Sequence, residues 1–263
     1  MQKSRNGLAV ALAAGVILGA LLTGADPALG QPAVATPPPK PMWDSLGTID
    51  LTLTRGNSRS FLVIGGLRTQ KKWTDDEVLL GGGAGYGDTT SSDANGHSHD
   101  TKTQDFLKGF GQWNHLFTER FYSGLRLEGL HDDIASIDYR FILSPMAGYY
   151  LIKETNTSLS VEAGPSFVYQ KLAGVESTYM GARVAERFEH KFETGAKIWE
   201  SAEWIPQVDK VENWILNLEA GVSAPITKSL DARLVVQDSY NNRPADDRLK
   251  NDLKLMAGIG YKF

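Results

Sequence analysis

Apolar and polar residues alternate along most of this chain, and the alternation is clearest in its last eleven residues. A strand has a side-chain period of two, so alternate residues share a face. One face would carry Leu253, Leu255, Ala257, Ile259, Tyr261 and Phe263, and the other Lys254, Met256, Gly258, Gly260 and Lys262. A strand that ends on an aromatic residue is typical of outer-membrane barrels. We therefore predict that this segment closes a barrel, with Tyr261 and Phe263 as its assembly signal.

The same alternation, bounded by turn residues, predicts about twelve strands in all. They span roughly residues 46–55, 60–73, 77–87, 102–115, 120–130, 137–152, 158–171, 181–193, 197–207, 213–224, 229–240 and 252–263. An even number of strands returns the two chain ends to the same side of a barrel. Ten or fourteen strands would therefore also be compatible with this prediction. The predicted fold is all-β: a closed antiparallel transmembrane β-barrel, built as an up-and-down meander.

The connections at the two ends of the predicted barrel differ in length and polarity. If the first strand starts in the periplasm, the periplasmic connections are short, as at 74–76 and 194–196. Most connections on the opposite side are longer and more polar, and residues 88–101 form the longest. Short periplasmic turns and longer external loops are typical of outer-membrane barrels. Aromatic residues also gather at the expected periplasmic strand ends, where their rings suit the headgroup layer. These are Trp73, Trp113, Tyr149, Tyr150, Tyr261 and Phe263.

The beginning of the chain predicts export. Lys3 and Arg5 precede an uninterrupted apolar stretch from Gly7 to Leu22, and small residues with proline follow. This order is that of a secretory signal peptide, here residues 1–30, with cleavage possible as late as residue 35. The apolar stretch is shorter than the ~20 residues of a spanning helix. Residues 36–45 are rich in proline and predict a stiff linker before the barrel at 46–263.

Composition narrows the possible functions. The formal net charge of −4 argues against nucleic acid as a partner. The chain has no cysteine, so it has neither a disulfide nor a thiol that could carry a lipid anchor. Apart from the signal peptide, no segment is long and apolar enough for a membrane helix. Low average hydropathy is compatible with a barrel, because alternating faces cancel in any averaging window.

Several segments resemble one family across residues 46–263. They include Leu53-Thr54-Arg55-Gly56-Asn57-Ser58, Asp138-Tyr139-Arg140, Gly148-Tyr149-Tyr150-Leu151, Asn242-Arg243-Pro244 and Gly260-Tyr261-Lys262-Phe263. The chain resembles the salt-induced outer-membrane protein family, which is domain-of-unknown-function family 481. The resemblance implies an outer-membrane β-barrel. It brings no established substrate or catalytic set, so no active site is carried over.

Three motifs suggest chemistry, and each has a simpler interpretation. His97-Ser98-His99-Asp100 could bind a metal, but two histidines leave the geometry unfixed, which favours a solvated loop. His131-Asp132-Asp133 could be an acid–base cluster, although a strand-end turn is favoured. The glycine-rich segment 81–87 lacks the lysine and the helix of a phosphate loop. Its alternate glycines instead leave one strand face bare, which suits close packing or curvature.

Charged residues occupy the face opposite the apolar one, which in a barrel is the lumen. Facing lipid, each would cost about 2–4 kcal/mol near the bilayer midplane. The candidate lumen-lining residues are Arg126, Glu128, Asp138, Arg140, Glu162, Arg183, Arg187, Glu189, Glu219, Asp231 and Arg233. Their mixed signs suit cross-strand pairing as well as solute selection. The sequence leaves open both a polar channel and a lumen plugged by charges.

These observations predict a barrel of the Gram-negative outer membrane, exported through a Sec-type signal peptide. The expected function is a small passive pore or a stress-induced envelope protein, and salt induction rests on the resemblance alone. A lipid-modifying or lipid-hydrolysing enzyme and a structural barrel with a plugged lumen are the alternatives. We expect no catalytic activity, no cofactor and no metal. The expected partners are outer-membrane lipid, lipopolysaccharide and the barrel-assembly machinery.

Overall fold

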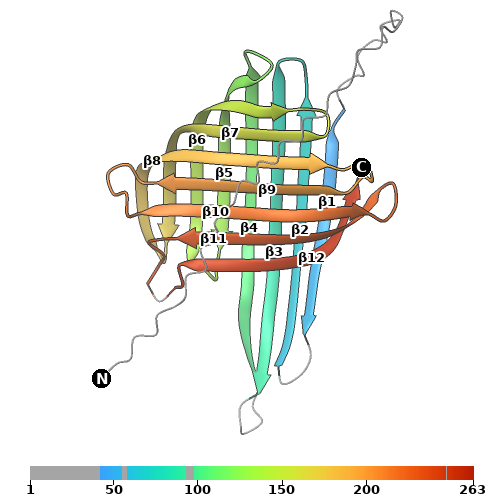
Figure 1. Cartoon of the computed structure of the whole chain (residues 1–263). Coiled ribbons are helices and arrows are strands. Elements are labelled where there is room, and N and C mark those ends of the chain that lie inside the picture. Colours follow the sequence, from blue (N-terminus) through green and yellow to red (C-terminus); the bar gives the residue numbers. More distant parts are fainter. Residues whose placement is uncertain (1–41, 55–57, 93–97, 247) are drawn as a thin grey trace, which may run out of the picture. The chain divides into compact units, whose positions relative to one another are not determined.

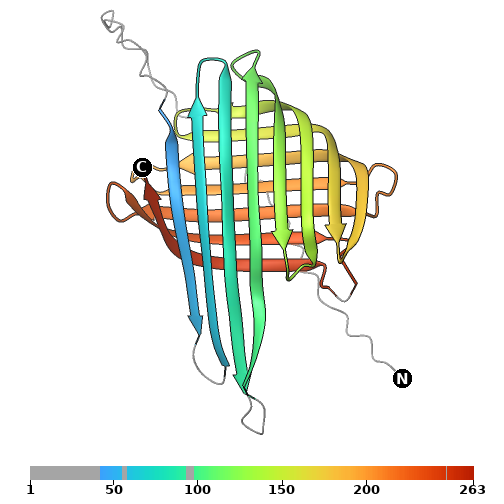
Figure 2. The same ribbon diagram turned by 180° about the vertical axis from the view of Figure 1, so that it is seen from behind.

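The computed structural model describes residues 42–263 except 55–57, 93–97 and 247. The predicted signal peptide and most of the predicted proline-rich linker lie outside the described residues. Twelve strands form one closed antiparallel barrel in which each strand pairs with its neighbours in sequence and β1 pairs with β12 (Figures 1 and 2). Within these residues no helix is both long and apolar enough to cross a bilayer. The predicted fold class and strand number are confirmed.

The strand bounds lie close to the predicted ones. The first six strands are β1 (Asp44–Thr54), β2 (Ser58–Lys72), β3 (Asp76–Ser92), β4 (Ser98–Leu116), β5 (Phe121–Asp132) and β6 (Ile137–Lys153). The last six are β7 (Thr157–Leu172), β8 (Val175–Lys191), β9 (Lys197–Pro206), β10 (Trp214–Pro225), β11 (Leu230–Asn241) and β12 (Asn251–Lys262). Below, the turn end is the end where the chain finishes at Phe263, and the loop end is the opposite one.

Two loop-end connections are shorter than predicted. The predicted loop at 88–101 is largely strand, because β3 and β4 stay paired out to Ser92 and Ser98. This hairpin and the β1–β2 hairpin extend beyond the other strands at the loop end (Figure 1). The predicted loop at 172–180 is a tight turn through Ala173 and Gly174, whose φ angles of 46° and 81° are left-handed. Two successive left-handed residues match the twist of a hairpin, and alternation alone did not reveal them.

The two faces have the predicted character along most of the strands. On β12, Leu253 and Leu255 are both 64% exposed while Met256 is 4% exposed. On β1, Ile49 and Leu51 are exposed and Asp50 is buried. A wall that exposes apolar side chains while burying polar ones inside suits lipid outside. Outward rings of Trp73, Trp113, Tyr149, Tyr261 and Phe263 line the turn end, as predicted.

The bare glycine face of β3 lets aromatic rings lie against the wall from within. A Cβ on Gly81 would lie 2.4 Å from the ring of Phe110, and one on Gly85 would lie 2.4 Å from the ring of Phe106. Both rings come from β4, the neighbouring strand. The alternate glycines therefore serve close packing of β4 side chains, as the sequence indicated.

Candidate functional site

Side chains from strands on opposite sides of the barrel meet inside it. Lys108 Nζ on β4 donates a hydrogen bond to Gln237 Oε1 on β11 at 3.3 Å. Arg126 Nε on β5 lies 4.0 Å from Glu203 Oε1 on β9. β4 and β11 are five strands apart around the closed barrel, and β5 and β9 are four apart. Such contacts can run only through the lumen, so they identify the lumen face of each strand.

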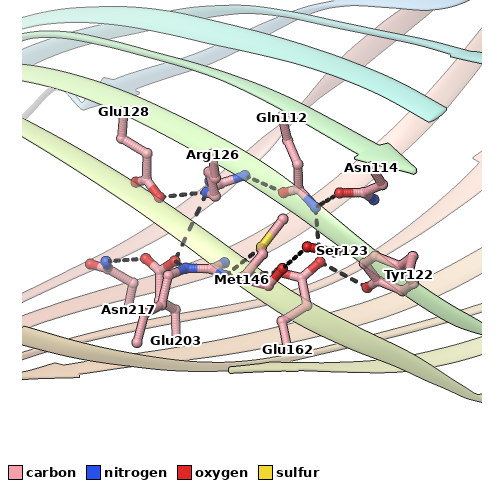
Figure 3. Close-up of polar contacts among 11 residues, drawn as sticks. Gln112, Asn114, Tyr122, Ser123, Arg126, Glu128, Met146, Glu162, Glu203 and Asn217 are labelled. Carbon is pink, nitrogen blue, oxygen red and sulfur yellow. Dashed lines mark hydrogen bonds and ion pairs between the residues drawn. The ribbon is translucent and has the colours of Figure 1, made fainter. Parts of the chain in front are cut away.

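Two arginines form the centre of a buried ion-pair network (Figure 3). Arg183 Nη1 lies 2.8 Å from Glu162 Oε2, and Arg183 Nε lies 2.6 Å from Glu203 Oε1. Arg126 Nε donates to Glu128 Oε1 at 2.5 Å. The Arg183 side chain is only 4% exposed. Because a buried charge is stable only when paired and hydrogen-bonded, each carboxylate here depends on its arginine partner.

Neutral side chains complete this central network. Gln112 Nε2 donates to Glu162 Oε1 at 2.8 Å and its Oε1 accepts from Arg126 Nη1 at 3.1 Å. The Tyr122 hydroxyl donates to Glu162 Oε1 at 2.9 Å, and Asn217 Nδ2 donates to Glu203 Oε2 at 3.1 Å. The network thus joins side chains of β4, β5, β7, β8, β9 and β10 (Figure 3). A network with most polar atoms satisfied makes the interior rigid.

A second chain of hydrogen bonds crosses the lumen. Glu219 accepts from Trp199 Nε1 and from Gln237 Nε2, both at 2.7 Å. Gln237 accepts in turn from Lys108, so the chain runs from β9 through β10 and β11 to β4. Like the central network, it joins strands that are not neighbours in the wall.

Two apolar clusters also lie in the lumen. Ile64, Phe106, Val235 and Met256 form one, with Leu62 and Trp199 packed against it. Ile142, Val168, Ile205 and Ile215 form the other, with Tyr179 packed against it. Val168, Val235 and Ile205 are 0% exposed. Packed side chains of this kind leave no water between them, so the two clusters occupy the parts of the lumen where they lie.

Most of the charged residues predicted to line the lumen do face it. Arg126, Glu128, Glu162, Arg183 and Glu219 belong to the two networks described above. Arg140 Nε donates to Gln170 Oε1 at 2.7 Å nearer the loop end. Nearer the turn end, Asp231 pairs with Lys262 at 2.7 Å, Arg233 lies 3.6 Å from Asp50, and Glu189 pairs with Lys197 at 2.9 Å. Arg187 lies between Arg183 and Glu189 on the same face of β8.

Two residues lie elsewhere than the alternation indicated. Asp138 is exposed at the loop end, where its carboxylate accepts from the Gly174 backbone N–H at 3.0 Å. The pairing register shifts between Ile137 and Tyr139, so simple alternation fails there. Tyr150 lies at the turn end as predicted but is 9% exposed and points inward. Its hydroxyl donates to Glu77 Oε2 on β3 at 2.6 Å, rather than lying in a headgroup layer.

Sequence reasoning missed several lumen residues, above all Glu203 and Gln112. On β9, charges stand on both faces: Glu200 is exposed on the outer wall, whereas Glu203 is in the network. Alternation in that segment is therefore ambiguous. Counting inward positions from Lys197 in steps of two would have found Glu203. Gln112 carries no charge, so a search for charged residues passed over it.

Two of the three suggestive motifs contain histidine, and the structure describes one of them only in part. His97 lies outside the described residues. Asp132 Oδ1 accepts from the Ala135 backbone N–H at 2.9 Å, which is the turn that the sequence favoured. In the described part of the chain, no three or more His, Cys, Asp or Glu residues are arranged to hold a metal ion.

Comparisons with known proteins agree with this architecture. The model of the family described as "Protein of unknown function, DUF481" matches residues 48–263. A search of curated proteins finds no match. Among solved structures, the NanC porin aligns with a TM-score of 0.50 at 8% identity, covering 84% of this chain and 100% of the porin.

Two further structures align less well. An outer membrane channel from Pseudomonas putida F1 has a TM-score of 0.46 at 11% identity, covering 88% of this chain and 100% of the channel. The KdgM porin has a TM-score of 0.44 at 8% identity, covering 84% of this chain and 99% of the porin. At these identities the likeness concerns the fold alone.

Proposed function

This chain belongs to the family described as protein of unknown function DUF481, whose model matches residues 48–263, and we propose that it is an outer-membrane barrel with a sealed lumen. In this proposal it serves the bacterial envelope as a structural component and not as an open diffusion pore. It is not an enzyme. The observation that carries the proposal is the set of side-chain contacts that cross the lumen between strands four and five apart.

The lumen contacts support sealing for an energetic reason. Water would have to separate Arg183 from Glu162 and Glu203, and also displace apolar groups such as Phe106, which is 4% exposed. Breaking one partner out of a buried ion pair costs about 3–5 kcal/mol. A continuous water path would break several such contacts at once, so the closed state is strongly favoured.

A narrow pore is the second candidate, and one observation favours it. Charged and amide groups, rather than only apolar ones, hold the central network, and such groups can exchange their partners for water. Conductance across planar bilayers separates the two functions. The sealed barrel predicts no stepwise current from the purified wild-type protein, whereas stepwise ohmic currents would overturn it.

A paired set of variants makes this experiment sharper. Phe106 and Lys108 point into the lumen from β4, and Leu107 between them faces outward with 62% exposure. The double variant F106A/K108A removes two cross-barrel contacts and is expected to pass current. L107A changes the lipid side only and is expected to remain silent. Electrophoretic mobility before and after boiling checks that each variant has formed a barrel.

The proposal also includes a route to the membrane and a set of partners. Export uses the predicted signal peptide at residues 1–30, and the barrel-assembly machinery recognises the strand that ends at Phe263. The loop end then faces outward, against lipopolysaccharide. The resemblance adds that osmotic stress induces the protein. Fractionation of a Gram-negative host and protein levels after a shift in salt concentration test these two statements.

A lipid-hydrolysing enzyme makes a separate prediction. A serine nucleophile would be labelled by a serine-reactive probe such as a fluorophosphonate. The sealed structural barrel predicts no labelling above that of the heat-denatured protein.

A further inference from the structure

The loop end holds a cavity of about 520 Å³ between the first part of β8 and the β9–β10 and β11–β12 connections. Its lining includes Tyr179 on β8, Gln207, Asp209 and Asn213 after β9, and Arg243 after β11. This volume falls within the range of small-molecule sites. The cavity is not part of the central network or of the second hydrogen-bonded chain.

Apolar side chains lie behind the part of this cavity that Tyr179 lines. Tyr179 packs against the cluster of Ile142, Val168, Ile205 and Ile215. Gln207, which also lines the cavity, is 7% exposed. A molecule that enters from the loop end would therefore meet the ring of Tyr179 and stop. The geometry is that of a blind vestibule, suited to holding a ligand rather than passing it on.

One wall of the vestibule is fixed by a short chain of side-chain hydrogen bonds. Asn213 Nδ2 donates to Gln207 Oε1 at 2.5 Å, and Gln207 Nε2 donates to Asp209 Oδ1 at 2.7 Å. The backbone joins the same chain, since the N–H of Gln207 donates to the Asn213 carbonyl at 2.8 Å. Each of the outer two side chains keeps hydrogen-bonding capacity: Asn213 has its Oδ1 and a second N–H, and Asp209 has its Oδ2.

Charge limits which ligand this wall fits. Asp209 and Glu212 oppose an anion, while Lys210 and Arg243 oppose a cation, so the formal charges of these four groups cancel. Arg243 and Glu212 also satisfy each other at 3.4 Å. What remains is a mixture of donors and acceptors beside an amphipathic aromatic ring. A hydroxyl group both donates and accepts, so a compact polyhydroxyl molecule matches this mixture.

We propose that the loop-end vestibule binds a saccharide, with one face of the sugar on the Tyr179 ring and its hydroxyls on Asn213 and Asp209. Two sources share this chemistry: a free sugar outside the cell and the core oligosaccharide of lipopolysaccharide beside the barrel. The site needs no open lumen, so it goes beyond the sealed barrel and does not depend on it. Current across planar bilayers would contradict the sealed barrel but would leave this inference unaffected.

Titration calorimetry on the full mature barrel tests the site. The detergent is a zwitterionic amine oxide, because the sugar headgroup of a maltoside would compete. The probes are trehalose, lactose and purified lipopolysaccharide core oligosaccharide, with inorganic phosphate and spermidine as charged comparisons. Binding of a free disaccharide assigns the site to solutes, and binding of the core oligosaccharide alone assigns it to the neighbouring lipid; both support a saccharide site.

Variants locate the binding. N213A removes an amide from the wall, and Y179L removes the ring while keeping an apolar side chain over the cluster. Each is expected to weaken saccharide binding by about tenfold or more, as for a lost hydrogen-bonding or stacking partner. N251A, at the loop end but outside the cavity lining, is the matched control and keeps wild-type affinity. No saccharide heat, equal affinity in all three variants, or binding of phosphate or spermidine in place of sugar would overturn the proposal.

Discussion

At the scale of single residues, the arrangement of the barrel interior depends on which charged side chains form ion pairs. The side chains of Arg183 and Glu162 come from adjacent strands, yet Glu162 also accepts a hydrogen bond from Gln112 on β4, three strands away. The sequence could place these charges on the lumen face, because alternation is local. It could not say that Glu203 would join Arg126 from four strands away, because that contact exists only after the barrel closes.

Removing Arg183 tests how much the central network contributes to stability. R183A leaves the carboxylates of Glu162 and Glu203 buried without their main partner, so unfolding should become easier by about 3–5 kcal/mol. Urea unfolding in lipid vesicles, followed by tryptophan fluorescence, measures the change. R243A breaks an ion pair whose side chains are more than half exposed, and it should change stability by less than about 1 kcal/mol. Equal losses in both variants would contradict the buried network.

At the scale of the strands, the alternating pattern predicted the number, the order and nearly all the bounds. It failed where a strand is polar on both faces, as in the extended β3–β4 hairpin. It also failed at the register shift beside Asp138 and at the two-residue turn through Ala173 and Gly174. Apolar and polar residues alternate where one face of a strand meets lipid and the other meets the lumen. Strand segments beyond the membrane lose this alternation but keep their backbone hydrogen bonds.

Arginine substitutions on two strands test the assignment of faces. Leu234 on β11 faces outward with 45% exposure, whereas Asn217 on β10 points inward and donates to Glu203 at 3.1 Å. L234R would place a charge against lipid at a cost of about 2–4 kcal/mol near the midplane, and assembly should fall sharply. N217R places the same charge beside a carboxylate and should assemble normally. Folded barrel in the outer-membrane fraction, judged by its mobility without boiling, gives the answer; equal yields would refute the assignment.

At the scale of the whole molecule, closure depends on a short seam. Across the described residues, β1 and β12 pair only from Leu46–Lys262 to Asp50–Gly258, five pairs in all. β1 nevertheless continues to Thr54 in its pairing with β2, and β12 pairs with β11 as far as Asn251. Gly258 fits closely at the last pair, where a Cβ would lie 2.2 Å from Asp50 Oδ1. The seam is therefore tied at the turn end and unpaired towards the loop end.

Because the chain has no native cysteine, engineered disulfides can measure this closure directly. Ile49 and Ile259 are paired across the seam, and paired strands hold Cα atoms at about 4.5–5.5 Å, which a disulfide can bridge. I49C/I259C should therefore oxidise rapidly and almost completely. Leu51 and Ala257 would form the next pair if the ladder continued beyond Asp50 and Gly258, and L51C/A257C should oxidise slowly. The mass of the peptides that span both sites reports each bond.

The comparison of the two disulfides also bears on how the barrel is held shut. If L51C/A257C oxidised as fast as I49C/I259C, the strands would be zipped along their whole length, and the short ladder would be wrong. Slow oxidation of L51C/A257C would mean that five backbone pairs hold the seam closed, together with the side chains behind its unpaired part. There Met256 of β12 and Leu62 of β2 pack into one apolar cluster. In that case, side chains inside the barrel also help to hold the wall closed. This gives the apolar cluster behind the seam a structural role.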